Sequence, residues 1–251
     1  MRIYVAGSLT VESGGAVFDE RGLPGGQGRV ILAMLAVEHR RPLSREEIAD
    51  ELWPSELPRS WKTALRAVVS KLRAAFAASG ISPHRLITNA FGCYQLHLPR
   101  DGWLDVDAAR DCLHAATTAL RREDAHSVLP NARVTSLICR QPFLAGQYGT
   151  WTCAQRDRLE DFRVRAEACL ADAYAMLSEH ELSALAAETA LGLDPYRERL
   201  HQRLIRSRLL AGDRAGAAHA FERCRELFDT ELRIQPTATT LALMREANPA
   251  V

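Results

Sequence analysis

One stretch of the chain, residues 57–100, contains seven Lys and Arg residues and neither Asp nor Glu. The segment just before it is acidic and contains Glu46, Glu47, Asp50, Glu51 and Glu56, so the charge changes abruptly along the chain. A carboxylate facing a phosphate would be repelled, so a basic surface without acids suits a nucleic-acid partner. The common alternative for an Arg-rich segment is a solvated helix face. The length of the acid-free run and the hairpin predicted after it favour nucleic acid.

Residues 60–79 are predicted to form a helix with two distinct faces. Apolar side chains recur at the helical period and give one apolar face, formed by Leu65, Val69, Leu72 and Phe76. A polar row runs beside it, about a third of a turn away, and consists of Arg59, Thr63, Arg66, Ser70 and Arg73. The first face can pack on a core, while the second presents guanidinium and hydroxyl groups that contact phosphates and base edges. We therefore predict that this helix lies in the major groove of DNA.

The predicted DNA contacts include the polar row, its neighbours on the helix and the segment that follows. They are Arg59, Lys62, Thr63, Arg66, Ser70, Lys71, Arg73, Arg85, Thr88 and Asn89. Arg66 lies near the middle of the helix, where side chains face the floor of the groove, so we expect it to read a base. Arg85 lies at the start of the following hairpin, and we expect it to hold a phosphate.

A β-hairpin is predicted directly after the basic helix. Its strands are expected at residues 85–88 and 93–98, around a turn at 89–92. A basic helix followed by a hairpin is the winged-helix arrangement. Short strands are also predicted near the N-terminus, at residues 2–5, 9–11 and 16–18.

Two helices are predicted between the N-terminal strands and the basic helix. The first covers residues 29–38, after a Gly-rich segment at 22–28. That segment lacks the spacing of a phosphate-binding loop and is expected to be a flexible connection. Ser44 and Glu47 form a capping box that opens the second helix, which is expected to end at Trp53.

Three segments resemble the OmpR-type winged-helix domain of the Streptomyces antibiotic regulatory protein (SARP) family. They are Leu52-Trp53, the run from Ala64-Leu65-Arg66 to Val69-Ser70-Lys71-Leu72-Arg73, and Gly92-Cys93-Tyr94-Gln95-Leu96. The family usually has Gly-Tyr-Arg-Leu in the hairpin, whereas here Cys93 intervenes and Gln95 stands in place of the Arg. The resemblance implies a DNA-binding domain over residues 1–100.

The remaining residues, 101–251, are predicted to be all helical and to follow a boundary at 100–102. Helices are expected at residues 105–122, 128–140, 151–178, 181–191, 195–210, 213–231 and 236–247. Phe162, Ala166 and Leu170 recur at helical spacing and are expected on the core face of the third of these helices. Several of their segments resemble the bacterial transcriptional activator domain that follows the winged helix in the same family. These are residues 142–144, 193–200, 210–213, 217–221 and 231–236. Pro195 and Pro236 each start a helix after a similar Leu-rich ending, in the manner of degenerate tetratricopeptide repeats. The expected fold is an α+β N-terminal winged helix followed by an all-α tetratricopeptide-like helical-repeat domain.

The resemblance also implies a function, that of a transcriptional activator from an actinomycete that regulates an antibiotic or other secondary-metabolite gene cluster. Such a protein would bind double-stranded DNA at direct repeats near the −35 region of a promoter. Two copies would lie head to tail on the DNA and recruit RNA polymerase through its sigma subunit. The alternative is a helical-repeat interaction protein whose winged helix docks on protein instead of DNA.

Charge and motif patterns bear on the other classes of protein. Residues 1–100 carry 13 Lys and Arg against 9 Asp and Glu, a net charge of +4, whereas residues 101–251 carry 19 against 22, a net charge of −3. The second part still contains a basic patch, formed by Arg197, Arg199, Arg203, Arg206 and Arg208. We expect a solvated, ion-paired helix surface there, and the alternative is a contact with a neighbouring protomer or with RNA polymerase. The sequence shows no catalytic, nucleotide-binding or metal-ligand motif, so we expect neither an enzyme nor a bound cofactor or metal. The six cysteines are expected to be buried free thiols. Without a long apolar run or a signal-peptide pattern, we expect a cytoplasmic protein with no membrane partner.

Overall fold

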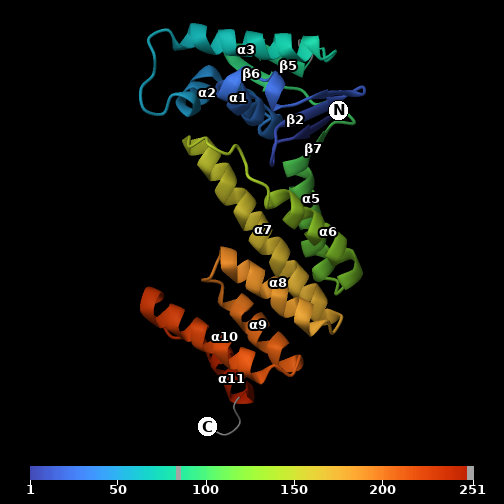
Figure 1. Ribbon diagram of the computed structural model, residues 1–251, viewed down its shortest axis with the longest axis vertical. Helices are drawn as coiled ribbons and strands as arrows, with labels where there is room; N and C mark the ends of the chain where they lie inside the picture. The colour runs from blue at the N-terminus through green and yellow to red at the C-terminus, as the bar shows by residue number, and fades with distance from the viewer. Residues whose placement is uncertain (83–85, 248–251) are drawn as a thin grey trace. The chain divides into compact units, whose positions relative to one another are not determined.

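The computed structural model describes residues 1–82 and 86–247, and the chain divides into two compact units (Figure 1). The first unit contains Met1–Ala109 and Ile138–Leu159. The second unit contains Arg110–Leu137 and the residues from Glu160 onwards.

A four-stranded sheet lies in the first unit, with the strand order β3-β2-β1-β7. Strands β1 (Arg2–Tyr4), β2 (Thr10–Ser13) and β3 (Ala16–Phe18) are antiparallel neighbours and confirm the three predicted N-terminal strands. Strand β7 (Trp103–Leu104) was not predicted, and it pairs with β1 in parallel. The sheet therefore includes residues beyond 100, and the division at residue 100 stays a prediction.

Three helices form the rest of the winged-helix core: α1 (Gly25–Val37), α2 (Arg45–Leu52) and α3 (Trp61–Ala78). Figure 1 shows α1 and α2 packed beneath α3. Helix α1 is buried on almost every side from Val30 to Ala36, as expected of a central core helix. The capping box at the start of α2 is present as predicted.

The predicted loop at residues 22–28 is partly wrong, because helix α1 already begins at Gly25. Glycine lowers helix propensity by about 1 kcal/mol per residue, and that composition favoured a loop. Packing outweighs this cost. Gly28 is buried, and a Cβ atom placed there would lie 2.5 Å from Cγ of Pro24, so the absent side chain lets the proline ring close over the first turn.

The hairpin belongs to a three-stranded sheet with the order β4-β6-β5. Its strands are β4 (Leu43–Ser44), β5 (Ile87–Ala90) and β6 (Cys93–Leu96). The predicted four-residue turn is too long, because Asn89 and Ala90 belong to β5 and only Phe91 and Gly92 connect the strands. A two-residue connection with positive φ at both positions matches the twist of the strands it joins.

Three long helices follow, and each contributes residues to both units: α5 (Asp105–Leu120), α6 (Ala125–Cys139) and α7 (Thr150–Met176). Helix α6 begins three residues earlier than predicted and contains Pro130 in its interior. Asp124 precedes it and accepts a hydrogen bond from the Ser127 backbone N at 3.1 Å, which satisfies one of the free N–H groups of the first turn.

Helices α8 to α11 complete the second unit: α8 (His180–Leu193), α9 (Glu198–Leu210), α10 (Arg214–Leu227) and α11 (Ala238–Ala247). Successive helices pack on one another, so the predicted helical-repeat architecture is confirmed. The helix predicted to continue through Glu231 changes at Phe228 into a short π-helix, η2 (Phe228–Leu232). Arg233 then ends it with φ 57°.

Two predictions about buried side chains need correction. Phe162 was expected on the core face of α7 but is half-buried, whereas Ala166 and Leu170 on that face are buried. All six cysteines are free, but only Cys139, Cys169 and Cys224 are buried. Within the part of the chain that the structure describes, no helix has the length and apolarity to cross a bilayer.

Candidate nucleic-acid interface

Helix α3 has the apolar face that the sequence predicts. Its four buried residues are Leu65, Val69, Leu72 and Phe76, and each is at most 1% exposed. The Phe76 ring lies 4.8 Å, centroid to centroid, from the ring of Phe18 at the end of β3. This packing fixes the rotation of α3 about its own axis and therefore decides which side chains face outward.

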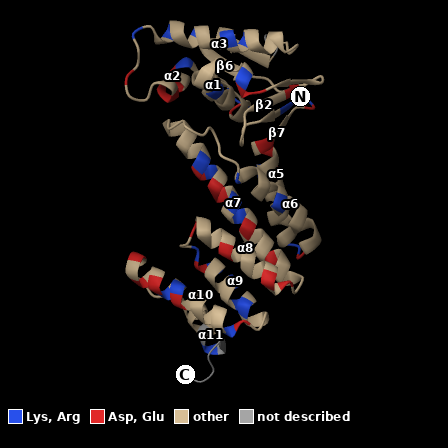
Figure 2. Cartoon of the chain, viewed as in Figure 1, with Lys and Arg blue, Asp and Glu red and all other residues tan. Residues whose placement is uncertain are grey.

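The outward side of α3 carries most of the residues predicted to contact DNA. The exposed ones are Lys62, Thr63, Arg66, Ser70 and Lys71. Figure 2 marks Lys and Arg positions along α3, and the helix contains no Asp or Glu. Ala67 and Ala74 are also exposed, and their small side chains leave room for a close partner. Arg59 is exposed as well, but it lies in the turn before the helix.

Arg73 is held differently from the rest of the polar row. Its side chain is half-buried, and Nη2 donates a hydrogen bond to the backbone oxygen of Ile87 at 2.9 Å. Its Nε is buried without a hydrogen-bond partner. Part of this guanidinium therefore ties α3 to strand β5, and the outward row is shorter than the sequence predicts.

The predicted hairpin residues make contacts within the protein. The hydroxyl of Thr88 and Nε2 of His97 are hydrogen-bonded at 2.8 Å, and Oδ1 of Asn89 accepts from Nη2 of Arg45 at 3.3 Å. Gln95 stands where the family usually has Arg, and its Nε2 donates to the backbone oxygen of His39 at 3.1 Å. Arg85 lies outside the described residues.

Arg45 is a residue at this site that the sequence did not suggest. It is the first residue of α2, and its backbone N donates to the oxygen of Gly92 at 3.2 Å. Its guanidinium lies 5.8 Å from the centroid of the Tyr94 ring, a cation–π arrangement. The capping box located Arg45 at a helix start, but strand β4, which brings it to the hairpin, has only two residues and no sequence signal.

Phe91 at the tip of the hairpin was also missed. Its side chain is fully exposed, at 105% of the reference area, and its backbone has φ 50°. The available signal was a large aromatic residue directly before the glycine of a predicted turn, a position where Asn or Gly is preferred.

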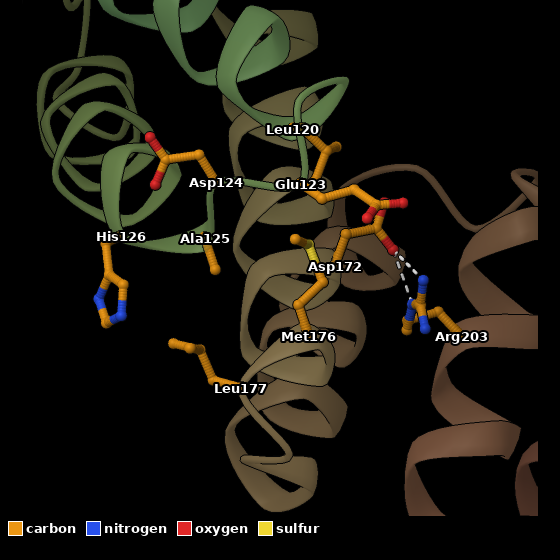
Figure 3. Close-up of a pocket in the computed structure, with 9 residues that line it drawn as sticks. All are labelled: Leu120, Glu123, Asp124, Ala125, His126, Asp172, Met176, Leu177 and Arg203. Atoms are coloured by element: carbon orange, nitrogen blue, oxygen red, sulfur yellow. Dashed lines mark hydrogen bonds and ion pairs between the residues drawn. The ribbon is translucent and has the colours of Figure 1, made fainter.

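The second unit offers a different surface. The predicted basic patch on α9 consists largely of paired charges, because Arg197 bonds Asp194 at 2.6 Å and Arg208 bonds Asp213 at 2.5 Å. These pairs confirm the interpretation of a solvated, ion-paired helix. A concavity of about 640 Å³ lies nearby (Figure 3). Asp172 and Arg203 form an ion pair there, and Glu123 contributes another carboxylate, so this hollow does not suit a polyanion.

Comparison with known proteins identifies the family to which the chain is related. The family model described as the bacterial transcriptional activator domain matches residues 104–247. The chain is 28% identical over 230 residues to the transcriptional regulatory protein EmbR of Mycobacterium tuberculosis. That alignment covers 86% of this chain and 55% of EmbR. The chain is also 28% identical over 238 residues to the regulatory protein AfsR of Streptomyces coelicolor. That alignment covers 90% of this chain and 22% of AfsR.

The fold also has a counterpart among solved structures. The structure of Mycobacterium tuberculosis EmbR in complex with a low-affinity phosphopeptide matches with a TM-score of 0.85 at 22% identity. The match covers 98% of this chain and 64% of that chain, so the chain spans only part of the relatives it resembles. The family match over more than half of the chain, together with these relatives, shows that this protein belongs to the SARP-type bacterial transcriptional activators.

Proposed function

We propose that this transcriptional regulator binds double-stranded DNA in a sequence-specific manner through helix α3 and the β5–β6 hairpin. The observation that carries the proposal is the outward side of α3. It presents Lys62, Arg66 and Lys71 in exposed positions on a helix without acids, and the opposite face is fixed in the core. Phosphates attract such a surface, and exposed Arg, Ser and Thr can reach base edges in the major groove.

The finer parts of the proposal follow from the family. We infer that the protein binds direct repeats near the −35 region, that two copies lie head to tail, and that they recruit RNA polymerase through its sigma subunit. A secondary-metabolite gene cluster is the proposed target. Residues 1–100 contain the proposed DNA contacts, and residues 101–251 are proposed to serve activation.

Selection of bound sequences from a random duplex pool tests the proposal. The test uses the full chain, because β7 and residues 138–159 belong to the same compact unit as the N-terminal sheet. We expect an enriched motif that occurs as a direct repeat spaced by about one helical turn. Binding should weaken steeply as salt rises, because Lys and Arg release counterions from the phosphates.

A matched control for this selection is Val17→Thr, which alters an exposed side chain on β3, a strand that contributes no proposed DNA contact. It should enrich the same motif as the unaltered protein. Sequence-specific binding would be contradicted if the unaltered protein enriched no motif and retained DNA only at very low salt. That result would favour the alternative of a winged helix that docks on protein.

A further inference from the structure

The concavity of about 640 Å³ in the second unit has a mixed lining that the proposed function does not use (Figure 3). Its walls come from the turn between α5 and α6, from α7 and from α9. Carboxylates, one guanidinium and several apolar side chains line it. Small-molecule sites in proteins have volumes of about 300–1,000 Å³, so the concavity is large enough to hold a small ligand.

Negative charge exceeds positive charge among the lining side chains. Arg203 is already paired with Asp172, and its Nε lies 2.7 Å from Oδ1 of that residue. Glu123 and Asp124 add two exposed carboxylates. Hydrogen bonding to Ser127 lowers the pKa of Asp124, so this carboxyl group is ionised at neutral pH. A carboxylate accepts several hydrogen bonds, so the concavity favours a ligand with positively charged donors.

Glu123 occupies a backbone position that favours glycine. It ends the turn after α5 in a Schellman motif, in which Glu123 N donates to Leu120 O and Asp124 N donates to Ala119 O, each at 3.1 Å. Its φ is 57°, in the left-handed region, where a side chain with a Cβ atom is less stable than glycine. Folding of this turn therefore gains nothing from the glutamate, whose carboxylate lines the concavity.

An apolar surface separates the two groups of carboxylates. In Figure 3, Met176 lies between Asp124 on one side and the carboxylates of Glu123 and Asp172 on the other. The Met176 side chain is 40% exposed, so a methylene chain can pack against it. A ligand with a cation at each end and an aliphatic chain between them would match all three parts of the lining.

We propose that this concavity binds an aliphatic diamine. One ammonium group lies between Glu123 and Asp172, the methylene chain packs on Met176, and the second ammonium group binds Asp124. A single Lys or Arg side chain of a protein partner carries one charge and would leave one end of the concavity unmatched. The site lies wholly within the second unit, so the inference does not depend on the DNA binding proposed above.

Calorimetric titration of the full chain with pentane-1,5-diamine tests the proposal. DNA is left out, because diamines also bind phosphates. Pentylamine has the same chain with one charge, and magnesium chloride supplies a divalent cation without a chain. We expect saturable binding of the diamine at one site per chain, binding of pentylamine about fivefold weaker or less, and no competition by magnesium.

The Glu123→Gly variant separates ligand binding from folding. It should melt at the same or a higher temperature, because glycine suits the left-handed position, and should bind the diamine about fivefold more weakly. Ser178→Gly is the matched control. Ser178 has φ 62° and ends α7 in the same motif, with Glu179 N donating to Tyr174 O at 2.9 Å, but it carries no charge. This control should gain the same stability and keep the affinity for the diamine.

Three results would overturn the inference. The first is equal affinity of Glu123→Gly and Ser178→Gly for the diamine. The second is a diamine affinity no higher than that of pentylamine, which would show that the two ends do not act together. The third is binding of a lysine-containing peptide by a chain that does not bind the diamine, which would assign the concavity to a protein partner.

Discussion

The carboxylate of Glu51 caps the first turn of helix α7 through Thr152, a residue 101 positions later in the chain. Oε1 of Glu51 accepts from the backbone N of Thr152 at 3.1 Å and from its hydroxyl at 2.5 Å, while Oε2 accepts from Trp151 N at 2.8 Å. Glu51 is only 8% exposed. A Cβ atom on Gly149 would lie 2.1 Å from Oε1, so the absence of a side chain there makes room for the carboxylate.

Glu51→Ala should destabilise the first unit by roughly 2–3 kcal/mol, because three donors at the start of α7 lose a charged acceptor. Gly149→Ala should also destabilise it, since the new side chain displaces the carboxylate. Denaturant unfolding of the full chain measures both effects. Asp50→Ala, at an exposed carboxylate on the same helix, is the control and should change stability little. Equal stability of Glu51→Ala and Asp50→Ala would show that the cap contributes nothing.

Arg73→Ala should lower the stability of the protein, whereas Arg66→Ala should leave it nearly unchanged. Arg73→Ala removes the bond from the guanidinium to Ile87 O in a half-buried position and should cost about 1–2 kcal/mol. Arg66 is exposed, and its removal should change stability by less than about 0.5 kcal/mol. Thermal melts of the two variants compare them directly. A melt for Arg73→Ala that matches that of Arg66→Ala would mean that the tie between α3 and β5 is not important for folding.

Asp105 should make the first unit more stable in mild acid. Its carboxylate accepts hydrogen bonds from Val5 N, Ala6 N and Val106 N, but burial outweighs these bonds and raises its pKa from 3.8 to about 6. The folded state therefore binds a proton more tightly than the unfolded state. This contribution to stability is complete below pH 3.8 and is lost as pH rises through about 6.

The pH effect is measured as the stability of the unaltered protein relative to Asp105→Asn, which cannot titrate. That difference should move in favour of the unaltered protein by roughly 2 kcal/mol between neutral pH and pH 4, given a shift of about two pKa units that is not yet fully expressed at pH 4. A difference that moves the other way would show that the three N–H donors outweigh the cost of burial.

Phe228 should matter more than Phe162 for the second unit. Phe228 is 3% exposed and packs edge-on against His201, with ring centroids 6.1 Å apart, whereas Phe162 is half-buried. Phe228→Ala should cost roughly 3–5 kcal/mol, and Phe162→Ala clearly less. Chemical denaturation of each variant measures these losses. A larger loss for Phe162→Ala would contradict the assignment of core positions.

Features that depend on neighbours along the chain were predictable from the sequence. The apolar face of α3 follows from the period of Leu65, Val69 and Leu72, and the cap of α2 follows from Ser44 and Glu47, which lie three residues apart. The OmpR-type resemblance then placed these elements in a winged helix. Both kinds of signal are short-range patterns that survive in a single sequence.

Features that depend on distant partners were not predictable. Trp103 belongs to the N-terminal sheet because it pairs with Arg2, about one hundred residues earlier in the chain. Strand β7 has only two residues, which are too few to show a strand pattern in the sequence. Periodicity placed Arg73 on the polar row but could not show that a carbonyl of β5 lies within its reach. The cap that Glu51 provides for α7 joins segments about one hundred residues apart, and an acidic residue on a helix gives no sign of it.

The most direct test of the account is whether Arg66 reads a base. The measurement is the affinity of Arg66→Ala for the selected duplex and for a scrambled duplex across a salt series. A bidentate contact between Arg and guanine contributes about 1–3 kcal/mol of discrimination, so the variant should lose that much more affinity on the selected duplex than on the scrambled one. Lys71→Ala, on the same exposed side of α3, serves as the comparison. It should weaken both duplexes alike and reduce the salt slope by about one. Equal losses on the two duplexes for Arg66→Ala would contradict base reading by α3.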